Sequence, residues 1–234
     1  MRLAEKIKNI FPQAADIPKM LLNDIPFIQK GYLVNGEIKV WEGPRQEVIS
    51  PVRVAEDTGL KPFNIGEYPL LTQVQALEAL DAAVAAYDHG QGVWPTLSVA
   101  ERIDHMERFV FRMMKERDRV VRFLMWEIGK SLENSKKEFD RTLQYIKDTL
   151  AALKDLDRIS SRFTIEENIM GQIRRAPMGV VLCMGPFNYP LNETFTTLIP
   201  ALVMGNTVVL KPPSHGCCFM HRFWRLFVMF SPKG

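Results

Sequence analysis

The segment from residue 179 to 211 constrains the fold more than any other part of the sequence. It holds a continuous apolar run at 179–185, a helix-forming stretch at about 191–204, and a second apolar run at 207–210. Continuous apolar runs are typical of strands buried on both faces of a parallel sheet. Two such strands joined by a helix form a right-handed βαβ unit. The sequence therefore predicts an α/β fold built on a doubly wound parallel sheet.

Helical patterns dominate the middle of the chain. Thr72 is a typical N-cap for a helix that runs to about residue 87, and Ser98 with Glu101 forms a capping box. A further helix is predicted over 132–156. Behind the capping box, an apolar stripe at helical spacing predicts core packing: Ile103, Met106, Val110, Met113 and Met114.

Two short β-hairpins are predicted on either side of this helical region. Asn35 and Gly36 supply the positive φ angles of a tight turn between 32–34 and 38–41. A second hairpin is predicted for 163–165 and 169–173. The rest of the first 65 or so residues is predicted to be irregular because prolines interrupt it repeatedly: Pro12, Pro18, Pro26, Pro44, Pro51 and Pro62.

Composition excludes several classes of protein. The chain is 47% hydrophobic and 24% charged, as in ordinary globular proteins, and its net charge of +3 is spread along the sequence, so no nucleic-acid partner is predicted. No stretch has the roughly 20 apolar residues that span a membrane, and the charged start does not match a secretory signal. We therefore expect a cytoplasmic protein with no membrane partner. The histidines and cysteines show no metal-ligand spacing, so no metal site is predicted.

Two polar residues follow the predicted buried strands. Asn188 lies between Pro186 and Pro190 after the first strand, and a carboxamide held there can donate a hydrogen bond to a developing oxyanion. The alternative is an asparagine that satisfies its own turn. Lys211 ends the second strand and can bind a ribose hydroxyl or a phosphate, the alternative being a solvated lysine. Because ligands bind at the carboxyl ends of such strands, both residues indicate one crevice.

Four sequence blocks resemble the aldehyde dehydrogenase superfamily in their order and spacing. The motifs Phe187-Asn188-Tyr189-Pro190 and Lys211-Pro212-Pro213-Ser214 are most similar to those of the NADP-dependent, non-phosphorylating glyceraldehyde-3-phosphate dehydrogenases. The Asn-Gly hairpin, the helical middle of the chain and Glu127-Ile128-Gly129-Lys130 are also similar to that group. The similarity extends from about residue 31 to 234. The blocks are Arg175-Ala176-Pro177-Met178-Gly179-Val180-Val181, Gly185-Pro186-Phe187-Asn188-Tyr189-Pro190, Ile199-Pro200-Ala201-Leu202 and Gly205-Asn206-Thr207-Val208-Val209-Leu210-Lys211-Pro212-Pro213.

The resemblance implies a division of the chain into parts. Residues 1–30 are an extension, and 31–157 are the hairpin and helical part of the cofactor-binding domain. Residues 158–174 are an association hairpin, and 175–234 begin the Rossmann-like cofactor-binding core, which is expected to be incomplete at its C-terminal end. The catalytic domain, with the nucleophilic cysteine and the general-base glutamate, is expected to be absent from these 234 residues.

The resemblance also implies roles for individual residues. Asn188 matches the oxyanion-hole asparagine, and Lys211 matches the lysine that contacts the adenosine ribose. Ser214 replaces the glutamate of many NAD-preferring members, which favours NADP over NAD because no carboxylate would repel the 2′-phosphate. Pro186 and Phe187 fall at cofactor-binding positions.

Two further residues match positions that bind the phosphate of glyceraldehyde 3-phosphate, Tyr189 and Arg141. For Arg141 the alternative is a helix-surface ion pair with Glu138 or with a group near Tyr145. Cys217 and Cys218 follow Gly216 at a predicted helix start, where a thiol pKa can fall. No His or Glu at suitable spacing accompanies them, so no catalytic thiol is predicted.

The implied function is the oxidation of an aldehyde to its carboxylic acid with NADP, by an enzyme of which this chain is a truncated part. The alternative is a non-catalytic assembly module that docks on a full-length subunit through the 163–173 hairpin. Homo-oligomers or such mixed assemblies are therefore the expected partners. We also expect the second buried strand to have an unpaired or poorly covered neighbour, so that an exposed strand edge beside the last helix makes the chain self-associate or need a partner. The apolar stripe of that helix is Phe219, Phe223, Leu226, Phe227 and Phe230.

Overall fold

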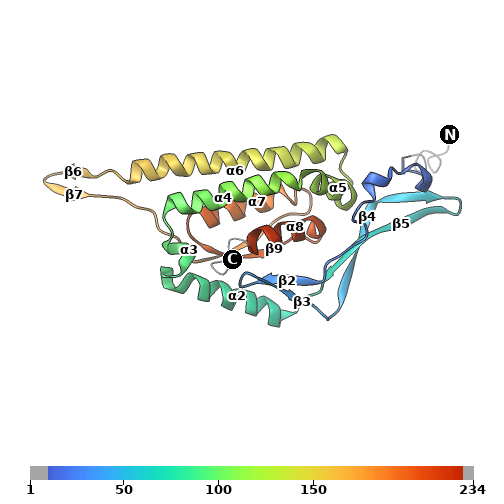
Figure 1. The fold of residues 1–234 in the computed structure, drawn as a ribbon, viewed down its shortest axis with the longest axis horizontal. Helices are drawn as coiled ribbons and strands as arrows, with labels where there is room; N and C mark the ends of the chain where they lie inside the picture. The colour runs from blue at the N-terminus through green and yellow to red at the C-terminus, as the bar shows by residue number, and fades with distance from the viewer. Residues whose placement is uncertain (1–9, 229–234) are drawn as a thin grey trace.

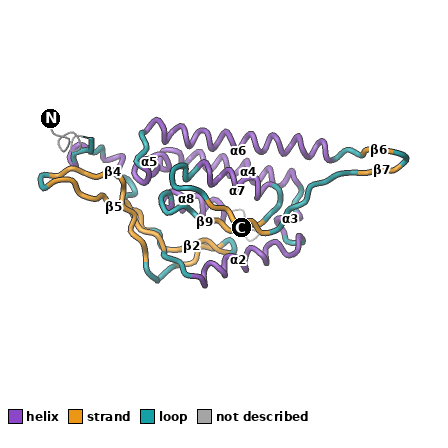
Figure 2. The backbone as a smooth tube through the Cα atoms, turned by 180° about the vertical axis from the view of Figure 1, so that it is seen from behind, coloured by secondary structure: helices purple, strands orange, loops and turns teal. Residues whose placement is uncertain are grey.

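The computed structural model describes residues 10–228 of the 234-residue chain (Figure 1). A group of packed helices forms the centre, and a β-hairpin extends from each end of it (Figures 1 and 2). The first described segment contains two short 3₁₀ helices, Ala14–Asp16 and Lys19–Leu21, and the short strand β1 (Phe27–Ile28). The indole of Trp126 donates a hydrogen bond of 2.8 Å to the carbonyl of Leu21, which joins this segment to the helices.

The predicted Asn-Gly hairpin is confirmed. Strands β2 (Gly31–Val34) and β3 (Glu37–Val40) pair antiparallel, with Gly31 opposite Val40 and Val34 opposite Glu37. Asn35 and Gly36 have φ angles of 50° and 74°. Both values lie in the left-handed region that a two-residue turn of this type requires.

A long second hairpin shows that the prediction of irregular structure over the first 65 or so residues was wrong. Strands β4 (Arg45–Glu56) and β5 (Gly59–Pro69) pair antiparallel, and β1 joins β5 as a parallel strand. The ladder shifts its register between Ser50 and Val54, so Pro51 and Pro62 fall where no ladder pairing is made. A bulge removes the need for a backbone N–H donor, so the prolines do not end the strands.

The middle of the chain is helical, as predicted. The helices are α2 (Gln73–Tyr87), α3 (Val93–Thr96), α4 (Val99–Lys115), α5 (Arg117–Ile128) and α6 (Leu132–Ser160), with a 3₁₀ turn at Asp88–Gly90. Both Thr72 and Ser98 form complete capping boxes. Four members of the predicted stripe on α4 are buried, but Met114 is 50% exposed because it lies beyond the edge of the packed face.

The core lies where α4, α5, α6, α7 (Asn192–Val203) and α8 (Cys217–Val228) meet. Each of its large rings contributes roughly 1.5–3 kcal/mol by leaving water. Among the described residues the strand at 207–211 has a single pairing partner, so the predicted unpaired strand edge is confirmed. The aromatic stripe of α8 beside it is nevertheless covered at Phe219 and Phe223, since α8 packs between α4 and α5; Phe230 lies outside the described residues. The fully buried phenylalanines are Phe109, Phe123, Phe139, Phe195, Phe219 and Phe223.

The predicted βαβ unit is confirmed. Strands β8 (Val180–Met184) and β9 (Thr207–Lys211) are parallel, with α7 connecting them, and α2 and α7 both pack on the pair (Figure 1). The prediction that the first strand is buried on both faces was only partly right. Cys183 is buried, but Leu182 and Met184 are 60% and 56% exposed because α2 packs mainly on β9.

The second predicted hairpin is also confirmed. Strands β6 (Thr164–Glu166) and β7 (Ile169–Gly171) pair antiparallel through a turn with φ angles of 49° at Glu167 and 66° at Asn168. The hairpin projects away from the helices beyond the end of α6 (Figure 1). None of the described helices combines the length and apolar character that crossing a bilayer requires.

Candidate functional site

The predicted site residues gather at the carboxyl ends of β8 and β9. Lys211 is the register partner of Met184, so the loop that begins at Gly185 starts beside Lys211. Pro186, Phe187, Asn188 and Tyr189 are exposed on that loop, and Lys211 and Ser214 are exposed on the segment after β9. The structure therefore places six of the seven predicted site residues at one edge of the sheet.

The loop after β8 is held by its contact with the first turn of α7. A Cβ atom on Gly185 would lie 1.8 Å from the hydroxyl oxygen of Thr194, so only glycine allows the approach. The Thr194 hydroxyl donates a 2.5 Å hydrogen bond to the carbonyl of Pro190, which is buried. The loop is thereby fixed at both ends while its middle faces solvent.

Asn188 occupies the exposed middle of this loop. Its carboxamide makes no hydrogen bond to any residue that the structure describes, so the alternative of an asparagine that satisfies its own turn finds no support. An amide N–H in this position is free to donate to an oxygen that is not part of the chain.

Tyr189 lies against a buried ion pair that the sequence analysis missed. The Nζ atom of Lys130 is 3.8 Å from the centre of the Tyr189 ring, and it also pairs with Glu138, whose side chain is 1% exposed. A cation over an aromatic face is attracted by the ring quadrupole. The α5–α6 junction is thus connected directly to the loop after β8.

Glu138 also acts as the N-cap of α7, although it belongs to α6. Its Oε1 atom accepts hydrogen bonds from the backbone N–H groups of Leu191 (3.1 Å) and Asn192 (3.3 Å). The residue at the cap position itself, Leu191, has no side-chain cap. A carboxylate at a helix N-terminus satisfies free N–H groups and interacts favourably with the helix dipole.

Glu127, which belongs to α5, caps the N-terminus of α8 in the same way. Its Oε1 atom accepts from the backbone N–H groups of Gly216 (3.0 Å) and Cys218 (3.2 Å). Burial raises the pKa of Glu127, and these backbone hydrogen bonds partly oppose the rise. Gly216 has a φ of 110°, and a Cβ there would lie 2.4 Å from the Cβ of Pro190. The start of α8 therefore packs directly on the loop after β8.

These two glutamates limit where a phosphate can bind. In doubly wound folds, the N-terminus of the helix after a strand is a ready anion site. Here Glu138 occupies that position at α7 and Glu127 occupies it at α8. A phosphate could bind at either helix only by displacing a buried carboxyl group. The exposed ammonium of Lys211, at the end of β9, is therefore a group at this edge that can bind a phosphate without such a displacement.

Arg141 is the predicted site residue that does not lie on this edge. It is exposed on α6, and no hydrogen bond or ion pair joins it to Tyr189 or Glu138 within the described part of the chain. The alternative of an ion pair with Glu138 is wrong, because Glu138 pairs with Lys130. Two other residues of α6 do contact α7: Thr142 hydrogen-bonds to Asn192, and the Tyr145 hydroxyl donates to the Thr196 carbonyl.

None of the three cysteines offers an exposed thiol. Cys183 is buried in β8, as predicted, and burial raises the pKa of its thiol. Cys217 and Cys218 begin α8, as predicted, but both are buried. A hydrogen bond with Cys217, together with burial, raises the pKa of Cys218. For Cys218 these two effects outweigh the lowering of the thiol pKa that a helix N-terminus can provide.

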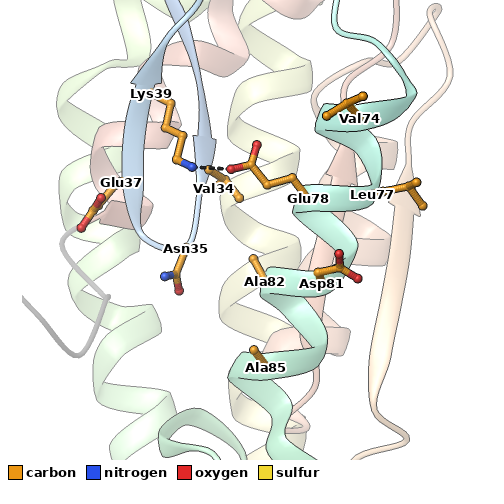
Figure 3. Close-up of a pocket in the computed structure, with 10 residues that line it drawn as sticks. All are labelled: Val34, Asn35, Glu37, Lys39, Val74, Leu77, Glu78, Asp81, Ala82 and Ala85. Carbon is orange, nitrogen blue, oxygen red and sulfur yellow. Dashed lines mark hydrogen bonds and ion pairs between the residues drawn. The ribbon is translucent and has the colours of Figure 1, made fainter.

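A separate cavity of about 700 Å³ lies between α2 and the β2–β3 hairpin (Figure 3). Glu78 projects into it from α2 and pairs with Lys39 of β3, while the Tyr32 hydroxyl donates to it at 2.9 Å. Hydrogen bonds from Lys39 and Tyr32 lower the pKa of Glu78. The acidic group is already neutralised, and the cavity contains none of the predicted site residues.

Comparison of the sequence with known proteins identifies the family of this chain. Residues 50–233 match the sequence profile of the Aldehyde dehydrogenase family. The chain is 29% identical over 187 residues to NADP-dependent glyceraldehyde-3-phosphate dehydrogenase of Streptococcus equinus, covering 78% of this chain and 37% of that protein. It is 32% identical over 162 residues to betaine aldehyde dehydrogenase of Bacillus subtilis, covering 65% of this chain and 31% of that protein.

Solved structures of aldehyde dehydrogenases have the same fold as this chain over most of its length. The crystal structure of NADP-dependent glyceraldehyde-3-phosphate dehydrogenase from Bacillus halodurans, complexed with NADP, superposes with a TM-score of 0.71 at 25% identity over 87% of this chain and 41% of that one. Indole-3-acetaldehyde dehydrogenase AldA of P. syringae shares the fold, with a TM-score of 0.73 at 23% identity over 90% of this chain and 40% of that one. The chain thus spans well under half the length of these relatives. Because the family profile matches most of the chain, including the βαβ unit, this chain belongs to the aldehyde dehydrogenase family.

Proposed function

We propose that this chain supplies the oxyanion donor and the adenosine end of the cofactor site in an NADP-dependent enzyme that oxidises glyceraldehyde 3-phosphate. The observation that carries this proposal is the register of β8 and β9, which sets the loop of Asn188 beside Lys211 at one sheet edge. The relatives from Streptococcus equinus and Bacillus halodurans, whose names specify this cofactor and substrate, support it. We also propose a cytoplasmic location, because the three cysteines are free thiols, as expected in a reducing compartment.

In this proposal Asn188 donates its amide N–H to the oxygen of the aldehyde as negative charge develops there. Such a donor is effective when it is already in position, because no reorganisation is then needed during the reaction. The contacts of Gly185 with Thr194 and of Glu138 with Leu191 supply that fixed position. Hydride transfer to the nicotinamide is the chemistry that bound NADP would supply.

Lys211 and Ser214 bind the adenosine end of the cofactor in this proposal, with Pro186 and Phe187 as its neighbours. The Lys211 ammonium donates to the ribose hydroxyls or to the 2′-phosphate, and the Ser214 hydroxyl accepts or donates without adding a negative charge. A glutamate at position 214 would instead repel the 2′-phosphate. NAD remains the alternative cofactor, since a serine does not exclude a free 2′-hydroxyl.

The substrate phosphate is assigned to Arg141 and the Tyr189 hydroxyl. The Arg141 guanidinium has no ion-pair partner among the described residues, so its charge is available to an anion. Lys130 lies on the face of the Tyr189 ring, but its charge is balanced by Glu138, so Arg141 supplies the positive charge in this proposal. An arginine can bind a phosphate through two parallel hydrogen bonds.

The cofactor part of the proposal can be tested on this chain by calorimetric titration with adenosine 2′,5′-bisphosphate, the portion of NADP that carries the 2′-phosphate. Because hydrogen bonds to charged groups contribute about 1.5–3 kcal/mol, Lys211→Ala should weaken binding by roughly tenfold or more. Ser214→Glu should weaken the bisphosphate selectively and leave 5′-AMP binding unchanged. Lys136→Ala, which removes an exposed lysine of α6, is the matched control.

Failure of the bisphosphate to bind the folded chain would contradict this assignment. Equal losses for Lys211→Ala and Lys136→Ala would show that the effect is one of net charge only.

A second candidate function, an assembly module, is favoured by the exposed apolar side chains of the β6–β7 hairpin. Ile165 and Ile169 are 69% and 71% exposed on a hairpin that projects from the body (Figure 1). Surfaces of this kind mark interaction sites. We propose that the hairpin pairs with another subunit, either a second copy of this chain or a full-length enzyme.

Sedimentation of the purified chain tests the association. The double variant Ile165→Ser and Ile169→Ser should shift an associated species toward the monomer. Val40→Ser, which removes a 73% exposed apolar side chain from the β2–β3 hairpin, should leave the distribution unchanged. A wild-type chain that sediments as a monomer at all concentrations, alone and with full-length enzyme, would contradict the module.

A further inference from the structure

Three potential metal ligands from distant parts of the sequence meet at the start of α8. Glu127 comes from α5, and Cys217 and Cys218 are the first two residues of α8. One carboxylate oxygen and the two sulfur atoms all lie within 4.8 Å of one another. The three residues are 1%, 6% and 1% exposed. Sequence spacing gave no sign of this cluster because 90 residues separate Glu127 from Cys217.

The cluster contains a polar atom that the protein itself leaves unsatisfied. Glu127 Oε1 accepts hydrogen bonds from the N–H groups of Gly216 and Cys218. The other oxygen, Oε2, is buried and has no hydrogen-bond partner among the described residues. Buried polar atoms nearly always have a partner, and leaving a carboxylate oxygen without one is costly. A cation bound between this carboxylate and the neighbouring sulfur atoms would satisfy it.

The donor set indicates which class of cation fits. Two thiolates with one carboxylate suit a thiophilic divalent ion such as Zn²⁺, whereas Ca²⁺ and Mg²⁺ require oxygen ligands. Zinc–sulfur bonds of about 2.3 Å at a tetrahedral angle bring two sulfur atoms to about 3.8 Å from each other. That spacing is compatible with the 4.8 Å limit of the cluster.

A disulfide between the two cysteines is the competing chemistry. Cα atoms of adjacent residues are about 3.8 Å apart, which is shorter than the usual range of about 4.4–6.8 Å for a disulfide. Closing that bond would also distort the first turn of α8, whose N–H groups bind Glu127. Coordination by one ion needs neither change.

We propose that Glu127, Cys217 and Cys218 bind one zinc-class divalent cation, which joins α5 to the start of α8. Both thiols release their protons to solvent as the ion binds, and a water molecule completes the coordination. The Cys217 sulfur also lies 3.6 Å from the carbonyl oxygen of Ser214, an exposed residue. Because Gly216 packs on Pro190, the ion would also brace the loop that carries Asn188. The site adjoins Ser214, one of the cofactor contacts proposed above, but does not use its side chain.

The test uses the full 234-residue chain, purified under reducing conditions, stripped with a chelator and titrated with Co²⁺. Thiolate-to-cobalt charge-transfer absorption is expected to saturate at about one equivalent, and Zn²⁺ should displace the cobalt. The double variant Cys217→Ser and Cys218→Ser should lose this absorption. Cys183→Ser, the matched control, alters the buried cysteine of β8 and should retain it.

The carboxylate is tested by Glu127→Gln, which keeps an acceptor for Gly216 and Cys218. Even outer-shell partners of metal sites change affinity by about 10- to 100-fold, so loss of this direct ligand should weaken Co²⁺ binding by at least about tenfold. Circular dichroism checks that each variant is folded.

A second measurement on the unaltered chain keeps the proposal testable if a variant fails to fold. One equivalent of Cd²⁺ should protect Cys217 and Cys218 from iodoacetamide in mild denaturant, as read by peptide mass spectrometry, and should leave Cys183 unprotected. Absence of the charge-transfer band, its survival in the double variant, or equal protection of all three thiols would overturn the proposal.

Discussion

Glu138 Oε1 accepts a 3.1 Å hydrogen bond from the backbone N–H of Leu191, which lies 53 residues further along the chain. This contact joins α6 to the loop that follows β8 and supplies the N-cap that α7 does not have in its own sequence. Since Lys130 balances the charge of Glu138 and also covers the ring of Tyr189, one buried pair fixes the end of the candidate site loop that leads into α7.

Replacing Glu138 should therefore destabilise the chain strongly. Glu138→Ala leaves Lys130 and two backbone N–H groups without a partner, and breaking a buried pair in this way costs about 3–5 kcal/mol. Glu138→Gln keeps an acceptor for Leu191 and should cost less. Urea denaturation followed by circular dichroism measures both. Glu133→Ala, which removes an exposed i,i+4 pair with Lys137, should change stability by about 0.5 kcal/mol or less, and an equal loss at both sites would contradict the buried cap.

Gly216 should not tolerate a side chain. Gly216→Ala places a Cβ 2.4 Å from Pro190 and forces a φ of 110° on an L-residue, so we expect a loss of at least about 1–3 kcal/mol. Gly171→Ala is the matched control, because nothing lies within 4 Å of its added Cβ. Thermal denaturation of the two variants should separate them clearly. Similar melting temperatures would show that the start of α8 can move away from the loop.

The Arg117–Asp140 pair should make a small, pH-dependent contribution to stability. The guanidinium donates to both carboxylate oxygens at 2.9 and 2.7 Å, and this hydrogen bonding lowers the pKa of Asp140 below its ordinary 3.8. A lowered folded-state pKa means that the stabilisation is complete above the unfolded pKa and is lost as the pH falls through the folded pKa.

Asp140→Asn should accordingly cost about 0.2–1 kcal/mol at neutral pH, a range that allows for the side chains being 32% and 54% exposed. The difference from the unaltered chain should shrink as the pH is lowered below about 3.8 and vanish in stronger acid. Urea denaturation at a series of pH values tests this. A difference that grows toward acid pH would show that the sign is wrong.

The purified chain by itself should not reduce NADP in the presence of glyceraldehyde 3-phosphate. The nucleophile in cysteine chemistry is the thiolate. All three thiols are buried; burial raises the pKa of Cys183, and a hydrogen bond with Cys217, together with burial, raises that of Cys218. The measurement is the absorbance of NADPH with and without the aldehyde. A steady, aldehyde-dependent rise would contradict this prediction, and Cys217→Ser and Cys218→Ser would then show whether either thiol is responsible.

The sequence by itself determined the elements whose signals lie within a few neighbouring residues. The capping boxes at Thr72 and Ser98, the turn at Asn35-Gly36 and the apolar runs of β8 and β9 were all predicted correctly. These features depend on local backbone geometry and on the period of the side chains. They also placed Asn188 and Lys211 at one sheet edge, since that follows from the direction of parallel strands; the roles of these residues remain predictions.

Only the tertiary structure decided which distant groups complete each local feature. The β4–β5 hairpin required a register shift around Pro51 that no local pattern indicates. Glu127 and Glu138 read as ordinary helix residues until folding brings the free N–H groups of α8 and α7 against them. The cost of a buried polar group depends on the partner that lies beside it, and that partner is selected by the packing of the whole chain rather than by its neighbours in sequence.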